Sequence, residues 1–589
     1  MTLLRLLPCA LAAVAALLAP VAAAEERCFA KDFMFGSATA SYQVEGAYMD
    51  VGRTPSIWDD FCRQRPGLAC ANVADDFFHR YPSDLKMMAD DGLQSFRFSV
   101  SWSRVMTWNP ATRRMVPNPA GIAFYHDLIE EMAKNNLVPI LTIYHWDLPS
   151  ALQTELSPAG WLSEGIIRHY VDFATLMFQE FGQKLDYWTT FNEPYSFVTQ
   201  GYGTGVHAPG FTGSENNTYI VTHNLLRAHA LAVQKFREFR NAGIVRPTAR
   251  IGIVLVAHMM FPLDQSNPKD VAAAERALQF DYGWFLQPMI SGDYPAVMRE
   301  VVGDRLPRFT AQEAEIIKGS YDLFMINHYA SNKDRHGNRN CGWFTAYPPG
   351  YLALMKWVSA HDPAAEVLLT ENGWCGNDEI DNQDQMWYYE NYMEQVYKAV
   401  TEENIKIIGY TAWSYLDNYE WGSFEPRFGL YYVNFTSQTG SKDYSISIRA
   451  GERINGIGMD IADPSGLKST IYHGGRGGSK TNKLTLEEGE YVMAVEAHWG
   501  EKGDHTRVKY LSFTTNKGHT VSGGIPTKNT GKEIAPEGYQ AGGFFGTCGK
   551  EIDSVGIFWT KIDKGGDSDD DSDASLSASG SESGSAASL

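Results

Sequence analysis

The sequence predicts an α/β protein in which a (β/α)8 barrel is followed by an all-β domain. Between about residues 30 and 435, short apolar runs alternate with helical periods, which is typical of such a barrel. From about Asp443 the helical periods stop, and β-like runs separated by Gly-rich turns follow. The 589 residues exceed one ordinary domain of roughly 100–200 residues and suffice for a large barrel with a smaller companion.

The composition excludes some classes of protein and some binding partners. Hydrophobic residues make up 44% and charged residues 20% of the chain, which excludes global disorder and a coiled coil. With 50 Lys and Arg against 70 Asp and Glu, the formal charge of −20 argues against nucleic acid and anionic membranes as partners. Aromatic residues make up 13%, which fits either sugar-stacking surfaces or large aromatic cores.

Both ends of the chain are predicted to lie outside the folded domains. Residues 1–24 have the pattern of a secretory signal peptide, with Arg5 before an apolar run and small residues before Glu25. A retained membrane anchor is the alternative, although the run is short and contains proline. Residues 564–589 are acidic and rich in Ser and Gly, which predicts a disordered tail. We therefore expect a secreted, extracellular protein.

Cysteines and sequons agree with secretion. Once the signal peptide is removed, the cysteines that remain are Cys28, Cys62, Cys70, Cys341, Cys375 and Cys548. An even number in a secreted chain indicates disulfides, and Cys62 with Cys70 is the best pair because the two close a short loop. Cys375 is expected to be a disulfide partner or a buried thiol. No CxxC motif is present, so no zinc site is predicted. Asn216 and Asn434 begin N-x-S/T sequons.

The barrel, over residues 25–442, is predicted from eight apolar runs that serve as strands. Between them, segments such as 122–135 and 386–400 place apolar side chains at helical spacing. The predicted strands are 33–37, 95–100, 138–144, 187–191, 251–256, 323–327, 367–370 and 407–413.

Polar side chains stand where these strands end, and the carboxyl ends of barrel strands are where function resides. Glu193 follows the fourth strand and Glu371 follows the seventh. These two carboxylates would face each other across the barrel mouth, which is the layout for glycoside hydrolysis by paired carboxyl groups.

Six stretches make the interpretation more specific. They are FGSATASYQVEGA at 35–47, FRFS at 96–99, His145, NEP at 192–194, ENG at 371–373 and EW at 420–421. Over about residues 33–435 the chain resembles family 1 glycoside hydrolases, the family of β-glucosidases, which have a TIM barrel.

The resemblance implies a role for each matching residue. It makes Glu371 the nucleophile and Glu193 the general acid/base, with Arg97 and Tyr329 supporting the nucleophile. The implied substrate-binding residues are Gln43, His145, Trp146, Asn192, Asn327, Tyr329, Trp413, Glu420, Trp421 and Phe428.

The implied function is a secreted retaining β-glucosidase that removes terminal β-D-glucosyl residues from a β-glucoside or oligosaccharide by double displacement. The two carboxyl groups would lie about 5 Å apart, and no metal or organic cofactor is required. Two alternatives stay open. One is a carbohydrate-binding protein with an inactive barrel, which the presence of both carboxylates disfavours. The other is a transglucosylase, which differs only in the acceptor.

The all-β domain, over residues 443–563, has its own resemblance. The stretches GGRGG at 474–478, FTTNKG at 513–518, GGFFG at 542–546 and GKEIDSVG at 549–556 are similar to jacalin-like lectins, whose fold is a β-prism of three small sheets. The resemblance implies that a glycan binds at Gly549 and Asp553. The alternative is a prism that binds no sugar and only covers the barrel.

The boundary between the two domains departs from the usual pattern. No helical period follows the eighth strand, and no long linker separates the barrel from the β domain. We therefore expect the β domain to cover the outer faces of the first and eighth strands through an apolar interface.

Overall fold

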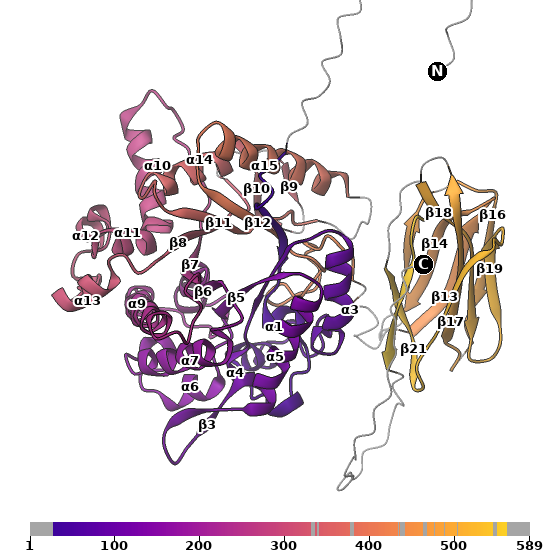
Figure 1. Ribbon diagram of the computed structural model, residues 1–589, viewed down its shortest axis with the longest axis horizontal. Helices are drawn as coiled ribbons and strands as arrows, with labels where there is room; N and C mark the ends of the chain where they lie inside the picture. The colour runs from indigo at the N-terminus through magenta and orange to yellow at the C-terminus, as the bar shows by residue number, and fades with distance from the viewer. Residues whose placement is uncertain are drawn as a thin grey trace, which may run out of the picture.

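A computed structural model of the chain describes residues 28–331, 336–338, 341–376, 382–433, 435, 442–462, 468–475, 477–487, 489–502, 505–545 and 551–561. Within these ranges the chain forms a closed barrel of parallel strands surrounded by helices, and an all-β domain (Figure 1). The predicted α/β class, with a barrel followed by a β domain, is confirmed.

All eight predicted barrel strands are present. They close in the order β1-β12-β11-β8-β7-β6-β5-β2, and every neighbouring pair is parallel. Side chains such as Ile140, Val254 and Leu368 form a separate buried cluster contributed by the strands themselves, so the barrel is a packed core rather than a pore. The strands are β1 Met34–Ala38, β2 Ser95–Ser99, β5 Val138–Tyr144, β6 Tyr187–Asn192, β7 Arg250–Val256, β8 Leu323–Asn327, β11 Glu366–Glu371 and β12 Ile407–Trp413.

The helices pack around the barrel with their apolar stripes inward. In α5, Tyr125, Leu128 and Met132 are buried at helical spacing, as predicted for 122–135. None of the helices in the described ranges has the length and apolar content needed to cross a membrane. The α-helices are α1 Ser41–Val44, α2 Ile57–Gln64, α3 Phe77–Asp90, α4 Trp102–Val105, α5 Pro119–Lys134, α6 Ser150–Glu155, α7 Ile166–Phe181, α8 Pro194–Thr199, α9 Asn217–Asn241, α10 Pro268–Asp281, α11 Gly283–Ser291, α12 Ala296–Val302, α13 Ala311–Ile317, α14 Pro348–Ser359 and α15 Gln383–Thr401.

The seam between β1 and β12 lacks a covering helix from the chain beyond β12, as predicted: no α-helix occurs in the described residues after that strand. The expected cover, however, is different. Phe29 packs against Phe35 of β1 with ring centroids 5.4 Å apart, and against Tyr397 of α15 at 5.7 Å. The barrel's own N-terminal segment therefore covers the outside of β1.

The segment after β12, residues 414–433, is hydrogen-bonded to the end of α3, on the side of the seam away from α15. The Tyr431 hydroxyl donates a hydrogen bond of 2.8 Å to Asp91, which follows α3, and the Tyr415 hydroxyl donates one of 2.7 Å to the same carboxylate. Beyond this segment, Phe435 is buried in the barrel core. The chain thus closes its barrel with residues that precede the β domain.

The β domain has a core of its own. Its strands form three antiparallel sheets, ordered β15-β14-β13-β16, β19-β18-β17-β20 and β21-β22, as a β-prism requires. Ile448, Leu511 and Phe513 lie in a buried cluster that shares no residue with the barrel core. The strands are β13 Lys442–Ala450, β14 Ile454–Ala462, β15 Lys468–Gly474, β16 Lys480–Thr485, β17 Val492–Lys502, β18 His505–Thr515, β19 Thr520–Gly524, β20 Asn529–Ile534, β21 Tyr539–Phe545 and β22 Gly556–Lys561.

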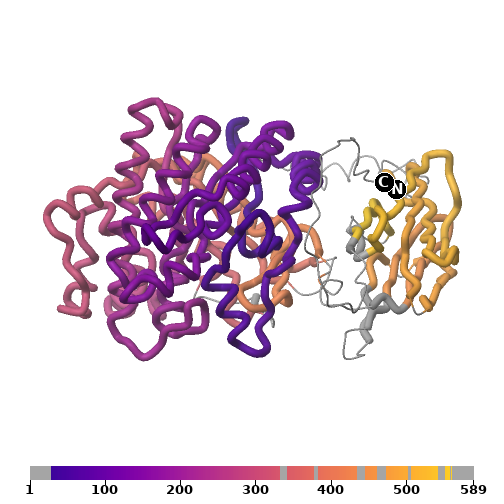
Figure 2. Tube along the Cα trace, turned by 90° about the horizontal axis from the view of Figure 1, so that it is seen from below, coloured from indigo at the N-terminus to yellow at the C-terminus, as the bar shows by residue number. Residues whose placement is uncertain are grey.

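Figure 2 shows the barrel and the β domain as two bodies. A ring contact joins them, between Tyr432 of the barrel segment and His473 of β15, with centroids 5.3 Å apart. The separate cores argue against the extensive apolar interface that we expected between the barrel and the β domain. The predicted signal peptide, the tail, Asn434, Cys548 and Gly549 lie outside the described residues, and those predictions stay predictions.

Separate cores predict that the barrel folds without the β domain. A chain that ends at residue 441 should stay soluble and melt within about 2 °C of the full chain, because no buried cluster is cut. A chain that ends at Trp413 should not fold, because it loses Tyr415, Tyr431 and Phe435. Melting curves of both truncations test this, and an insoluble or strongly destabilised 441-residue chain would restore the expected apolar interface.

Candidate active site

The predicted site residues of the barrel converge at the carboxyl ends of its strands. Glu371 is the last residue of β11 and pairs in register with Asn327, the last residue of β8. Asn192 ends β6, and Glu193 follows it directly, held by a 3.0 Å hydrogen bond from its backbone amide to the Val254 carbonyl. Strand register therefore sets the positions of both carboxylates.

Glu371 is surrounded by hydrogen-bond donors. The guanidinium of Arg97, which is fully buried in β2, forms an ion pair with one carboxylate oxygen of Glu371. The Tyr329 hydroxyl donates a 2.7 Å hydrogen bond to the other oxygen. Burial and the charge of Glu371 raise the pKa of Tyr329 well above its usual value, so this phenol stays protonated and remains a donor. Both oxygens of Glu371 are thus stabilised as a carboxylate.

Glu193 lies in an environment of the opposite kind. Burial, with the nearby charge of Glu371, raises its pKa to about 8. Hydrogen bonds from Asn327 Nδ2 to Oε1, at 2.7 Å, and from Ser196 Oγ to Oε2, at 2.8 Å, oppose this rise without cancelling it. Glu193 is therefore protonated at neutral pH.

Aromatic rings build one wall of the site. The Trp421 ring packs on Trp146, with centroids 4.2 Å apart, and lies nearly parallel to the His145 ring at 6.0 Å. The Trp413 indole donates to Glu420 at 3.1 Å. Burial raises the pKa of Glu420 to about 8 and lowers the pKa of His145 well below its usual value, so both groups are neutral at pH 7. The wall combines apolar faces with uncharged polar groups.

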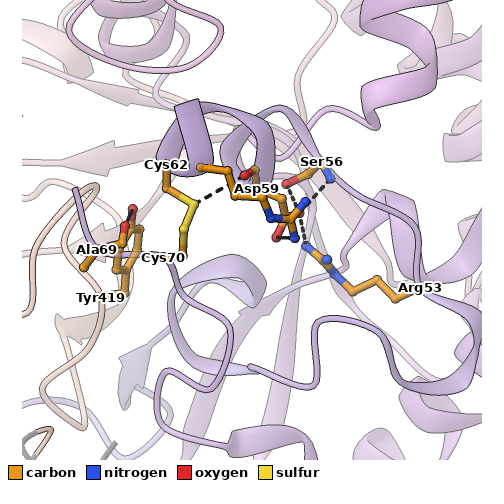
Figure 3. The surroundings of a disulfide bond; sticks show 8 residues. Arg53, Ser56, Asp59, Cys62, Ala69, Cys70 and Tyr419 are labelled. Atoms are coloured by element: carbon orange, nitrogen blue, oxygen red, sulfur yellow. Dashed lines mark hydrogen bonds and ion pairs between the residues drawn. A yellow bond between two sulfur atoms is a disulfide. The ribbon is translucent and has the colours of Figure 1, made fainter. Parts of the chain in front are cut away.

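Gln43 joins this wall through a chain of contacts that ends at a disulfide. Its Nε2 donates to the Tyr419 carbonyl at 2.7 Å, and the Tyr419 hydroxyl donates to the Ala69 carbonyl at 2.9 Å. Ala69 precedes Cys70, which is bonded to Cys62, and Figure 3 shows Tyr419 beside this disulfide. The predicted Cys62–Cys70 pair is confirmed.

The α2 helix anchors the other end of that disulfide. The Asp59 carboxylate accepts hydrogen bonds from Arg53 at 2.9 Å and from the Ser56 amide at 2.7 Å, as the dashed lines in Figure 3 show. The bond from the Ser56 amide is one half of a capping box that fixes the start of α2, the helix that carries Cys62. The disulfide therefore braces the Gln43 side of the mouth against a well-capped helix.

The opposite side of the mouth holds residues that the sequence did not reveal. Trp343 has 53% of its surface exposed, and its ring lies 6.2 Å from Tyr329 and 5.9 Å from His258. It belongs to β10, Cys341–Ala346, which a Cys341–Cys375 disulfide ties to the segment after β11. The pair settles Cys375 as a disulfide partner.

Phe428 and Ser196 complete the site. Phe428, which the sequence predicted, lies with its ring 5.8 Å from that of Tyr329. Ser196 was missed, although its spacing of three residues after Glu193 places it one helical turn further on, within reach of that carboxyl.

The predicted lectin site is described only in part. Asp553 forms a 2.9 Å ion pair with Arg507, and Arg453 pairs with the adjacent Glu551. The described half of this loop is therefore a cluster of paired charges.

A (β/α)8 barrel whose mouth holds one stabilised carboxylate, one protonated carboxyl and an aromatic wall has the features of a glycoside hydrolase. The chain belongs to glycosyl hydrolase family 1, whose family model matches residues 25–341 and 332–449. The model of the jacalin-like lectin domain matches residues 428–558, so the predicted fusion is confirmed. The predicted boundary at residues 442 and 443 falls where the two matches overlap and stays a prediction.

Curated relatives agree with the family. The chain is 36% identical over 461 residues to beta-glucosidase 32 of Arabidopsis thaliana, which covers 69% of this chain and 85% of the relative. It is 37% identical over 455 residues to furostanol glycoside 26-O-beta-glucosidase of Hellenia speciosa, covering 69% and 79%.

Solved structures agree as well. A rice β-glucosidase matches with a TM-score of 0.64 at 33% identity, covering 69% of this chain and 94% of that one. The β-glucosidase from Trichoderma harzianum matches with a TM-score of 0.64 at 34% identity, covering 69% and 93%.

Proposed function

We propose that the barrel is a retaining β-glucosidase with Glu371 as nucleophile and Glu193 as general acid/base. The observation that supports this assignment is the contrast between the two carboxyl groups: Arg97 and Tyr329 hold Glu371 as an anion, while burial keeps Glu193 protonated. A double displacement requires that pair, one charged and one protonated.

The two steps follow from these charge states. Glu371 attacks the anomeric carbon, and Glu193 gives its proton to the leaving oxygen, so the aglycone departs as a neutral alcohol and a glucosyl ester remains. In the second step the ionised Glu193 takes a proton from water as that water attacks the anomeric carbon. Glu371 leaves as a carboxylate, and Glu193 is protonated again.

The wall around the pair would hold the glucosyl unit. Trp413 and Trp421 offer apolar faces for the sugar ring, and Gln43, His145 and Glu420 offer neutral polar groups for its hydroxyls. The half-exposed Trp343 stands on the opposite side of the mouth, where a leaving group would emerge. Terminal β-glucosides fit this arrangement.

The stereochemistry of the product tests the mechanism. We expect NMR to show the β-anomer of glucose first from an aryl β-glucoside, because two inversions restore the configuration. Glu371→Gly should abolish hydrolysis and regain turnover with azide, which replaces the lost nucleophile. An initially formed α-anomer would show inversion, and a Glu371→Gly variant that azide does not rescue would remove the nucleophile assignment.

The acid role has its own signature. Glu193→Ala should lose about 10²–10⁴-fold in kcat/KM on substrates with poor leaving groups and much less on dinitrophenyl glucosides, which depart without a proton. In the wild type, kcat/KM should fall above about pH 8, since Glu193 must be protonated to act as an acid. This alkaline limb should disappear in Glu193→Ala. Equal losses on all leaving groups would contradict the role.

We further propose that the β domain binds a glycan through the loop that contains Asp553. The support is the match to the jacalin-like lectin model over residues 428–558. Asp553→Ala in the full chain should lose binding on a glycan array while its hydrolysis of aryl glucosides stays unchanged. Wild-type chain that binds no glycan on the array would favour a prism without lectin activity.

A further inference from the structure

The hydrogen-bond network fixes which oxygen of Glu193 can hold the proton. Arg97 can only donate, so the amide oxygen of Asn192 must face its NH2 group, at 2.7 Å. That same oxygen lies 3.3 Å from Asn327 Nδ2, and the oxygen of Asn327 accepts from the Thr370 hydroxyl at 2.7 Å. The Asn327 amide is thereby oriented with its NH2 group toward Glu193.

One oxygen of Glu193 therefore always faces a donor. Asn327 Nδ2 lies 2.7 Å from Oε1 and has no lone pair to accept a proton from it. Because the carbonyl oxygen of a protonated carboxyl group is the better acceptor, this contact favours Oε2 as the oxygen that carries the proton. Within the part of the chain that the structure describes, the hydrogen-bond partner of Oε2 is the Ser196 hydroxyl, at 2.8 Å.

We propose that Ser196 is a positioning residue for the acid/base, holding Oε2 of Glu193 through both halves of the reaction. A hydroxyl accepts from the protonated Oε2 until the departing oxygen takes that proton and, after rotation, donates to the ionised Oε2, which an amide NH2 group or a methyl group cannot do. The proton leaves Oε2 for the departing oxygen in the first step and returns to Oε2 from water in the second. This inference rests on the proposed acid/base role of Glu193.

Local geometry holds the serine in place. Glu193 precedes α8 with a φ of 44°, and the backbone amide of Ser196 donates to the Glu193 carbonyl at 3.0 Å. This first turn brings the two side chains onto the same side of the helix start. Thr199, one turn further, bonds its hydroxyl to the Tyr195 carbonyl at 2.7 Å instead and serves as a matched control.

Several titratable or charged groups face Glu193, and the test has to separate them from it. They are Glu371, Arg97, Tyr329, Glu420 and Asp281. Glu420 and Asp281 also have pKa values raised to about 8. Ser196 forms its hydrogen bond with Glu193, so a change in the pH profile on removing that hydroxyl reports on Glu193.

The experiment compares full-length S196A, S196T and T199A with the wild type. Alanine is favoured in helices, so S196A should fold. Its alkaline limb in kcat/KM should move up by about one pH unit, because the ionised carboxylate loses a donor. On a dinitrophenyl glucoside the first step needs no proton, so we expect the second step to limit kcat. The kcat of S196A should then fall about tenfold at pH 7, and KM should fall with it as the intermediate accumulates. S196T should restore both values.

An alkaline limb that stays in place in S196A would overturn the proposal, as would an equal displacement in T199A. A wild-type chain that hydrolyses no β-glycoside would instead overturn the proposed function. The two failures are therefore distinguishable.

Discussion

The buried guanidinium of Arg97 is the constraint on which the rest of the active site depends. It bridges Glu371 and Asn192, which come from strands on different sides of the barrel. A buried charge of this kind persists only when it is paired, and removal of one partner typically costs about 3–5 kcal/mol. Because guanidinium groups only donate, Arg97 also sets the orientation of the Asn192 amide, and through it that of Asn327. One cation thus organises both carboxyl groups.

That arrangement explains how two identical side chains in one pocket take different charge states. Arg97 bonds to Glu371 directly but influences Glu193 only weakly, behind burial and the repulsion from Glu371. Neutralising Glu193 by protonation removes a like-charge repulsion, and the same holds for Glu420. A pocket with three carboxyl groups and one cation is therefore stable at neutral pH.

The sequence predicted the parts of this structure that depend on local pattern. All eight barrel strands were visible as apolar runs, and Glu193 and Glu371 were visible because Glu193 directly follows a strand and Glu371 ends one. The cover of the β1–β12 seam was predicted wrongly, since it rests on Phe29 and on Tyr431, which meet their partners only in three dimensions. Trp343 was missed for the same reason. The contact between Ser196 and Glu193 could have been predicted from helical spacing. Its role in positioning the proton of Glu193, however, depends on the orientation of the Asn327 amide.

The segment after β12 shows why the barrel closes without a further helix there. Its backbone groups need partners, which a helix would supply internally. Here the Asp417 carboxylate supplies partners for the Gly429 amide at 2.9 Å and the Val433 amide at 3.2 Å, and it also accepts from the Arg427 side chain at 3.3 Å. These bonds fold the loop back on itself. The same loop holds Glu420 and Trp421 at the mouth. One segment thus both closes the barrel and supplies part of the aromatic wall at its mouth, which couples the two features.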